Sequence, residues 1–251
     1  MASIDNAKTI LIIGATSGIG RALAEALAAL PSKPVVIAAG RRVDRLAELK
    51  VKGLETVQMD VIAPLDELKQ NVEGIIAKYP ELDAVIISSG VQYQHFFTKG
   101  VNLAEIHKEI AVNYLAVVNL ITFFLPHFLK LSETSRPSWL IPISSGLALK
   151  PGTTVPNYSA SKAAVHSLTN CLRAQLKDTS VNVLEIIPPL VESELHDEQG
   201  TTPALSKFWM PLDVYTTEAV KGLRAGTSHI SAGKAAETWE LFKPFDGPLG
   251  A

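Results

Sequence analysis

Residues 9–30 of the 251-residue chain read TILIIGATSGIGRALAEALAAL. The β-branched residues 9–13 predict a short strand, Gly14, Gly18 and Gly20 predict a turn, and the Ala/Leu-rich residues 19–30 predict a helix. This order forms an anion site, because free backbone N–H groups and the positive end of the helix dipole meet at the turn. The spacing GxxxGxG, with no Gly-Lys-Ser/Thr after it, favours a dinucleotide over a nucleoside triphosphate.

The composition is that of a globular enzyme. Hydrophobic residues make up 47% and charged residues 19% of the chain, and a formal net charge of −2 argues against a nucleic-acid partner. The single cysteine, Cys171, excludes an internal disulfide scaffold, and its apolar helical surroundings predict a buried position. Residues 1–8 lack the apolar stretch of a signal peptide, which predicts a cytoplasmic location. Residues 115–125, the most apolar segment, are shorter than the ~20 residues of a membrane span and predict a core helix.

Strands and helices alternate along the rest of the chain. Further strands are predicted at residues 35–39, 54–59, 82–88, 139–143, 181–187 and 229–231, and long helices at residues 103–131 and 157–177, the first with a weak point at Pro126. The alternation predicts an α/β fold, a Rossmann-type doubly wound parallel sheet of about seven strands with helices on both faces. We expect a single dinucleotide-binding and catalytic domain over residues 1–251, with a substrate-loop insertion at about residues 189–212.

The second predicted strand runs into Gly40, Arg41 and Arg42. In a dinucleotide fold this strand end reaches the adenosine ribose, where an acid selects the free 2′-hydroxyl of NAD and an arginine accommodates the 2′-phosphate of NADP. No acid is present at these three positions, so the sequence predicts NADP(H), with Arg41 as the first choice of phosphate partner and Arg42 as the second. The alternative is that both arginines are solvated charges at the start of a helix.

The densest chemical pattern combines Ser145 with Tyr158 and Lys162. Tyr158 and Lys162 are four residues apart on a predicted helix, so their side chains share one face. A nearby ammonium group favours the phenolate, which predicts a pKa of Tyr158 below its ordinary value of ~10. A tyrosine of this kind can exchange protons as a general acid and base.

These motifs together resemble the classical short-chain dehydrogenase/reductase family over nearly the whole chain, from Ile10 to about Ser231. The motif residues are Gly14-Ala-Thr-Ser-Gly18-Ile19-Gly20, Asp60, Asn113, Ser144-Ser145, Tyr158-x-x-x-Lys162 and Ile187-Pro188-Pro189-x-Val191-x-Ser193. Ser145 precedes Tyr158 by thirteen residues, from 145 to 158, which is the usual family spacing and favours Ser145 over Ser144 as the catalytic serine.

The resemblance implies direct hydride transfer at a nicotinamide with four catalytic residues. In the reductive direction Tyr158 would protonate the carbonyl oxygen, Ser145 would orient that oxygen, Lys162 would bind the nicotinamide ribose and lower the pKa of Tyr158, and Asn113 would hold a water that links Lys162 to solvent. The implied cofactor-binding residues are Gly14, Thr16, Ser17, Gly18, Ile19, Gly20, Arg41, Arg42, Asp60, Val61, Ser89, Gly90, Tyr158, Lys162, Val191 and Ser193.

Three positions depart from the family pattern. Where the family has Asn-Asn-Ala-Gly after the fourth strand, this chain has Ile87-Ser88-Ser89-Gly90. A side-chain hydrogen bond across the sheet must therefore come from Ser88 or be absent. Pro-Gly after the sixth strand reads Pro188-Pro189, which stiffens the start of the substrate loop. Ile13 stands where the family has threonine, and no catalytic position is lost.

Three segments are expected to shape the substrate pocket, namely residues 92–100, 146–155 and 191–211. In the first, aromatic residues either line the pocket or anchor the loop to the core; they are Tyr93, His95, Phe96 and Phe97. In the third, Phe208 and Trp209 suggest a lid over bound cofactor. The same loop carries residue types that ligate metals, but neighbouring acids on a loop are more often solvated, so no metal site is predicted at Glu194, His196, Asp197 and Glu198.

The leading functional hypothesis is an NADPH-dependent reductase that converts a ketone, aldehyde or dicarbonyl to the alcohol. The alternatives are an NAD(P)-dependent secondary-alcohol dehydrogenase of the sugar or steroid type and a dinucleotide sensor without turnover; the intact Ser145, Tyr158 and Lys162 argue against the sensor. The expected partner is a small-molecule carbonyl or alcohol substrate, with no nucleic acid and no membrane. The resemblance further implies a homodimer or homotetramer, paired through the helices at residues 103–131 and 157–177.

Overall fold

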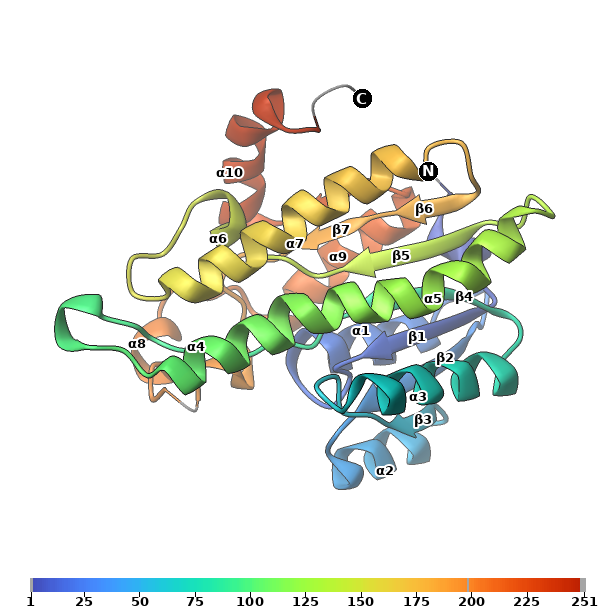
Figure 1. The fold of residues 1–251 in the computed structure, drawn as a ribbon, viewed down its shortest axis with the longest axis horizontal. Coiled ribbons are helices and arrows are strands. Elements are labelled where there is room, and N and C mark those ends of the chain that lie inside the picture. Colours follow the sequence, from blue (N-terminus) through green and yellow to red (C-terminus); the bar gives the residue numbers. More distant parts are fainter. Residues whose placement is uncertain (1, 198, 249–251) are drawn as a thin grey trace.

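A parallel sheet of six strands lies at the centre of the structure, a computed structural model that describes residues 2–197 and 199–248 (Figure 1). Its strands lie in the order β3-β2-β1-β4-β5-β6. Their bounds are Thr9–Ile13 for β1, Val35–Gly40 for β2, Glu55–Gln58 for β3, Leu82–Ile87 for β4, Ser138–Pro142 for β5 and Val181–Val183 for β6. Two more strands, β7 (Glu185–Ile187) and β8 (His229–Ser231), form a separate parallel pair.

Helices cover both faces of this sheet (Figure 1). The α-helices are α1 (Gly18–Ala28), α2 (Val43–Val51), α3 (Leu65–Lys78), α4 (Leu103–Ile110), α5 (Ala116–Ser132), α6 (Gly146–Leu149), α7 (Pro156–Gln175), α8 (Thr202–Leu205), α9 (Leu212–Ala225) and α10 (Gly233–Phe242). A π-helical turn, η3 (Ala111–Leu115), joins α4 to α5. Short 3-10 turns are η1 (Ile4–Asn6), η2 (Phe97–Lys99), η4 (Glu194–His196) and η5 (Lys243–Phe245).

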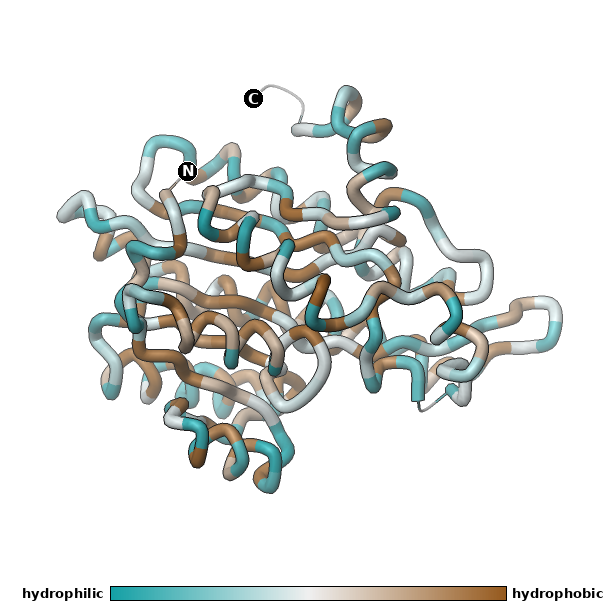
Figure 2. Tube along the Cα trace, turned by 180° about the vertical axis from the view of Figure 1, so that it is seen from behind, coloured by the Kyte–Doolittle hydropathy of each residue, from teal (hydrophilic) through white to brown (hydrophobic). Residues whose placement is uncertain are grey.

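The two faces of the sheet bury two different apolar clusters. Ile10 and Ile12 of β1 pack with residues of α1 and α9, whereas Leu11 and Ile13 pack with residues of α3, α5 and α7. A parallel strand covered on both faces needs apolar residues at every position, and all five residues of β1 are buried. Figure 2 shows the resulting continuous hydrophobic colour along the central strands. The predicted doubly wound parallel fold is confirmed.

The strand order places a crevice next to β1. From β1 the chain proceeds to β2 and β3 on one side, and it then returns to β4 on the other side of β1. In open α/β sheets the loops beyond the carboxyl ends of such neighbouring strands diverge, and ligands bind between them. The turns after β1, β4 and β5 are therefore the segments that position a site.

Residues 181–187 differ from the single strand that the sequence predicts. β6 pairs with β5, whereas β7 pairs with β8, and the change of neighbour occurs at Leu184. The Leu184 N–H still donates to the Leu140 carbonyl at 3.1 Å, but the Glu185 N–H donates to Ser228 at 2.8 Å. The described central sheet therefore has six strands rather than about seven, because the predicted seventh strand joins β7.

Two helix predictions also need correction. The irregular point between residues 103 and 132 is the π-helical turn η3, whereas Pro126 lies within α5. π-Helical turns are often found at functional sites, and η3 carries the predicted catalytic residue Asn113. Cys171 is exposed rather than buried, because it lies on the solvent-facing side of α7.

One helix among the described residues is long and apolar enough to cross a membrane by length and composition alone. It is the continuous run of α4, η3 and α5, 30 residues from Leu103 to Ser132. Leu120, Phe124 and Phe128 on its inner side are fully buried against the sheet. This packing is typical of a core helix, as the sequence predicts.

Candidate active site

The turn after β1 has the backbone geometry of an anion-binding turn. Gly14 has a φ of +88°, and a side chain on it would begin 2.6 Å from the Ser89 backbone nitrogen after β4. A side chain on Gly20 would begin 2.3 Å from the Gly14 carbonyl oxygen. Only glycine fits these two positions, so the turn brings β1, the start of α1 and the end of β4 into close contact. The first turn of α1 leaves its N–H groups directed out of the helix toward this point.

The end of β2 lies against the same turn. A side chain on Gly40 would begin 2.6 Å from Cγ2 of Thr16, so Thr16 fills the space that an acidic side chain would need here. The guanidinium of Arg42 donates from Nε to Thr16 Oγ1 at 3.2 Å, and its Nη2 donates to Ser17 Oγ. Arg41 is exposed, and its carbonyl accepts a hydrogen bond from Gln58 at 3.5 Å. Of the two predicted phosphate partners, Arg42 is thus the one in contact with the glycine turn.

Asp60 and Val61 follow β3 at the adjoining edge of the sheet. Asp60 Oδ1 accepts a hydrogen bond from the Ile62 N–H at 3.1 Å, which fixes the turn into α3. Both residues are partly buried. They lie beyond the carboxyl end of β3, two strands from β1.

After β4, Ser89 and Gly90 lead to Asn113. Asn113 is fully buried in η3; its Nδ2 donates to the Val91 carbonyl at 2.9 Å and to Ser161 Oγ at 3.1 Å, and its Oδ1 accepts from the Val91 N–H at 2.9 Å. A side chain on Gly90 would begin 3.5 Å from Asn113 Oδ1 and 3.7 Å from Lys162 Nζ. Gly90 therefore keeps the space between Asn113 and Lys162 open.

Ser145 and Tyr158 meet beyond the end of β5. Ser145 caps α6, with its Oγ accepting the Leu147 N–H at 3.1 Å, and its side chain lies close enough to Tyr158 to affect the pKa of the phenol. Lys162 lies one turn after Tyr158 on α7, with Nζ 5.7 Å from the centre of the tyrosine ring. Lys162 Nζ donates to the Ile143 carbonyl at 2.9 Å. The structure thus brings Asn113, Ser145, Tyr158 and Lys162 together.

The pKa of Tyr158 differs from the value below ~10 that the sequence predicts. Burial raises it to about 12, and this effect outweighs the lowering by Ser145. Burial also lowers the pKa of Lys162 to about 8, although Glu109 and Glu185 act in the opposite direction. The reason for the difference is burial, which disfavours the charged phenolate, while Lys162 Nζ donates its hydrogen bond to the Ile143 carbonyl. Tyr158 is consequently protonated throughout the neutral range, the state of a general acid.

The predicted substrate loop is closed at its base and folds back over the glycine turn. Val191 and Met210 form a β-bridge, with the Glu192 N–H donating to Met210 at 3.0 Å. A side chain on Gly18 would begin 3.2 Å from Ser193 Cβ, so Ser193 covers the start of α1. Phe208, one of the two predicted lid residues, is 71% exposed. Glu198 lies outside the described residues.

The segment after β4 uses its aromatic residues in two ways. Tyr93 and His95 are buried and anchor the segment, with the His95 N–H donating to the Thr154 carbonyl at 3.0 Å. Phe96 and Phe97 are exposed. Anchoring therefore accounts for two of the four predicted pocket residues.

Glu109 is a residue that the sequence analysis missed. It is fully buried, and its carboxylate accepts from the Tyr93 N–H at 2.9 Å and from Asn157 Nδ2 at 2.6 Å. Burial raises its own pKa, and its charge raises the pKa values of Tyr158 and Lys162. The available signal was its place four residues before Asn113, which puts an acid on the same helix face one turn from a catalytic position.

Known proteins resemble this chain in sequence and in fold. The profile of the short chain dehydrogenase family matches residues 8–204. The uncharacterized oxidoreductase DltE of Bacillus subtilis (strain 168) is 34% identical over 226 residues, which cover 89% of this chain and 87% of that protein. This chain belongs to the short-chain dehydrogenase/reductase family. It is therefore an oxidoreductase by family.

Solved structures agree with this short-chain dehydrogenase fold from end to end. A short chain dehydrogenase/reductase from Burkholderia phymatum in complex with NAD matches with a TM-score of 0.81 at 20% identity, covering 100% of both chains. A short-chain dehydrogenase from Sphingobium yanoikuyae in complex with NADPH matches with a TM-score of 0.79 at 21% identity, covering 97% of both chains. At these identities the likeness establishes the fold alone.

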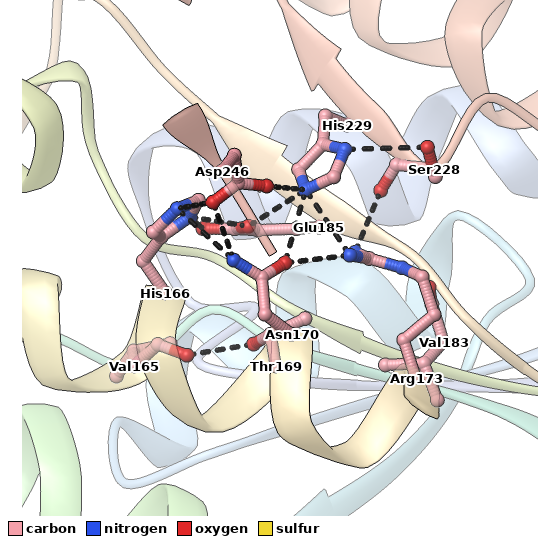
Figure 3. A network of polar contacts seen from close by, with 10 residues as sticks. All are labelled: Val165, His166, Thr169, Asn170, Arg173, Val183, Glu185, Ser228, His229 and Asp246. Atoms are coloured by element: carbon pink, nitrogen blue, oxygen red, sulfur yellow. Dashed lines mark hydrogen bonds and ion pairs between the residues drawn. The ribbon is translucent and has the colours of Figure 1, made fainter. Parts of the chain in front are cut away.

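A second polar cluster of this short-chain dehydrogenase lies further along α7, and Figure 3 shows it. His166 Nδ1 is 2.8 Å from one carboxylate oxygen of Glu185 and 3.0 Å from the other, and His166 Nε2 is 2.9 Å from Asp246 Oδ1. Arg173 donates to His229 Nε2 at 3.1 Å. The cluster joins α7, β7, β8 and the tail after α10, four segments that are distant in sequence.

The ligand types His166, Glu185 and His229 would also suit a metal ion, because one donor atom from each lies within 4.8 Å of the others. Tetrahedral zinc with bonds of about 2.1 Å keeps its donor atoms about 3.4 Å apart, however. The 2.8 Å contact between His166 and Glu185 is shorter than that and fits a hydrogen bond. Burial lowers the pKa of His166, but hydrogen bonds to Glu185 and Asp246 outweigh it, so the net shift is upward and favours the charged imidazole beside these two carboxylates. These distances and charges fit a hydrogen-bonded ionic network.

Proposed function

We propose that the chain is an NADPH-dependent reductase that converts a ketone, aldehyde or dicarbonyl to the alcohol. The observation that carries this proposal is the buried Tyr158 beside Ser145 and one helical turn from Lys162, at the carboxyl edge of the sheet. A protonated phenol is the donor that a carbonyl oxygen needs as hydride reaches its carbon. This donor favours a reductase over a dinucleotide sensor, because a sensor needs no acid at this position.

The residues present fit a dinucleotide. Gly14 and Gly20 let the turn after β1 pack tightly between the start of α1 and the end of β4, and the helix N-terminus there favours phosphate. When bound, NADPH supplies the hydride. Ser89, Gly90, Val191 and Ser193 would line the path from this turn toward Tyr158. One solved structure with this fold contains NADPH, at 21% identity, and another contains NAD, at 20% identity. The coenzyme preference of this chain must therefore be argued from its own residues.

Each catalytic side chain has a role that follows from its contacts. Tyr158 donates its proton to the substrate oxygen, and Ser145 orients that oxygen. The Ser145 side chain is held in place by the hydrogen bond that its Oγ accepts from the Leu147 N–H. Lys162, next to the open space at Gly90, would bind the ribose and carry a positive charge beside the phenol. Asn113 holds the Val91 backbone and thereby fixes the floor between Gly90 and Lys162, where a proton-relaying water would lie.

Reduction is expected to slow as the pH rises above about 8, because Lys162 loses its positive charge around its pKa of about 8. Tyr158 keeps its proton over this range, since its pKa is raised to about 12. The measurement is kcat/KM against pH for wild type and for Lys162→Arg, whose guanidinium stays charged. An arginine variant that shows the same descending limb as wild type would contradict the assignment to Lys162.

The coenzyme preference is proposed to come from Gly40, Arg41 and Arg42. Thr16 excludes an acid at position 40, and Arg42 lies against Thr16 and Ser17. Arg42→Ala is expected to weaken NADPH binding by about tenfold or more, because a charged hydrogen bond to phosphate is lost, and to change NADH binding by less than about twofold. Calorimetric titration of both coenzymes, with Arg41→Ala in parallel, checks this. Equal affinity of wild type for NADPH and NADH would count against the NADP(H) assignment.

Three further proposals accompany this function. We propose that residues 1–251 act as one catalytic unit with residues 189–212 as its substrate loop, and that the enzyme is cytoplasmic. We also propose a homodimer or homotetramer. An apolar hollow between α5 and α7 supports the pairing; it is lined by Val118, Ile121, Leu125, Leu129, Leu168 and Leu172.

A further inference from the structure

Two arginines at the start of α2 hold a carboxylate that comes from the substrate loop. Arg42 Nη1 is 2.7 Å from Glu194 Oε2, and Arg45 Nη1 is 3.2 Å from Glu194 Oε1. Both carboxylate oxygens are therefore engaged, each by a different guanidinium. The sequence separation of 152 residues between Arg42 and Glu194 shows that only the folded chain creates this pairing.

The same Arg42 guanidinium also contacts the glycine turn, through Thr16 Oγ1 and Ser17 Oγ. The Glu194 carboxylate thus lies beside the place where the coenzyme's 2′-phosphate is proposed to bind. Carboxylate and phosphate are interchangeable partners for arginine, because both present two oxygens to the planar guanidinium. Glu194 and a 2′-phosphate would therefore use the same donors on Arg42.

The backbone on both sides of Glu194 is held in place. Ser193 lies over Gly18, where a side chain on the glycine would begin 3.2 Å from Ser193 Cβ. His196, at the other end of η4, is buried, and its Nδ1 is 3.2 Å from Gln92 Oε1. Because η4 is held at both ends, Glu194 can pair with the arginines without the entropic cost of ordering a flexible loop.

We infer that Glu194 is a specificity-determining residue that competes with the coenzyme's 2′-phosphate for Arg42 and Arg45. This inference rests on the proposed use of NADP(H). NADPH must displace the carboxylate, whereas NADH, which lacks the 2′-phosphate, binds without breaking the two ion pairs. Glu194 therefore makes the ratio of the Kd of NADH to the Kd of NADPH smaller than the two arginines alone would make it.

The size of the effect is limited by solvent. The side chains of Arg42, Glu194 and Arg45 are 44%, 42% and 34% exposed, so each ion pair is a partly screened surface interaction. Removing the competing carboxylate is expected to tighten NADPH binding by about three- to tenfold. The gain is expected to shrink at high ionic strength, because salt screens exposed charges.

The test is calorimetric titration of NADPH and of NADH into wild type, Glu194→Gln and Glu192→Gln. Glutamine keeps the length of the side chain and removes its charge. Glu192 is a matched control, because it is an exposed acid of the same loop whose carboxylate contacts the Leu212 N–H at 3.4 Å instead of an arginine. We expect the Kd of NADPH to fall only in Glu194→Gln, and the Kd of NADH to stay within about twofold in all three proteins.

The outcomes separate this inference from the proposed function. If wild type binds NADPH but Glu194→Gln leaves its Kd unchanged, or tightens NADPH and NADH equally, the competition at the 2′-phosphate is overturned and the NADPH assignment stands. If Arg42→Ala leaves the NADPH preference intact, the arginine assignment and this inference fall together. If wild type does not bind NADPH, the proposed function itself is overturned.

Discussion

Tyr158→Phe is expected to lower kcat for carbonyl reduction by about 10²–10⁴-fold, because the substitution removes the general acid and leaves the ring in place. Tyr158 is 7% exposed, and its hydroxyl lies beside Ser145. Binding of NADPH is expected to change by less than about twofold, since the backbone turn after β1 is untouched. Steady-state kinetics together with calorimetric titration of NADPH separate the two effects.

The matched control is Tyr79→Phe. Tyr79 also loses a hydrogen-bonded hydroxyl, which donates to Glu55 Oε2 at 2.6 Å, but it lies just before β4, at the opposite end of the sheet from the site. The kcat of the Tyr79→Phe variant should equal that of wild type. Retention of more than about a tenth of the wild-type kcat in Tyr158→Phe would show that another group protonates the substrate.

Glu185→Gln is expected to have the largest effect on stability. Glu185 is fully buried and both of its carboxylate oxygens contact His166 Nδ1, so its neutralisation removes one of the two carboxylates that contact His166. Breaking a buried pair in this way costs about 3–5 kcal/mol in the free energy of unfolding. For a domain of this size that lowers Tm by about 6–20 °C. Differential scanning calorimetry of Glu185→Gln measures the shift, with Glu237→Gln, an exposed acid of α10, as control.

The same cluster gives stability a pH dependence on both sides of neutrality. Burial lowers the pKa of His166, but hydrogen bonds to Glu185 and Asp246 outweigh it, so the net pKa is raised and stability is lost as the pH rises through that value. Burial and then Arg173 lower the pKa of His229 from 6.5 to about 4, so stability is also lost as the pH falls from 6.5 toward 4. Glu185→Gln should flatten the alkaline limb. An unchanged alkaline limb, or a Tm within about 2 °C of wild type, would contradict the role of this network.

The fold could be predicted from the sequence because its signals are local. The apolar run Thr9–Ile13, the glycines after it and the regular alternation of strands and helices each follow from neighbouring residues, and all are confirmed. The division of residues 181–187 between two sheets was not predictable in this way. It depends on which strand lies next to Glu185, and that strand, β8, comes more than forty residues later, at 229 against 185.

The site shows the same limit. The spacing of Ser145, Tyr158 and Lys162 predicts their proximity, since two of them share a helix face and the third ends a strand. The pKa of Tyr158 depends instead on burial and on Glu109, neither of which the spacing contains. The pairing of Arg42 with Glu194 and of His166 with Asp246 likewise requires the tertiary structure, because each joins segments at least 80 residues apart.

The measurement that tests the proposed reductase most directly is the loss of NADPH absorbance with a panel of aromatic diketones, aliphatic ketones, quinones and sugars. NADPH deuterated at the transferred position allows the product to be analysed by mass spectrometry. We predict turnover of at least one carbonyl compound, one deuterium on the carbon of the new alcohol, and no comparable turnover in Tyr158→Phe. The reductase proposal would be contradicted if NADPH binds tightly but is not consumed with any member of the panel. It would also be contradicted if Tyr158→Phe consumes NADPH as fast as wild type.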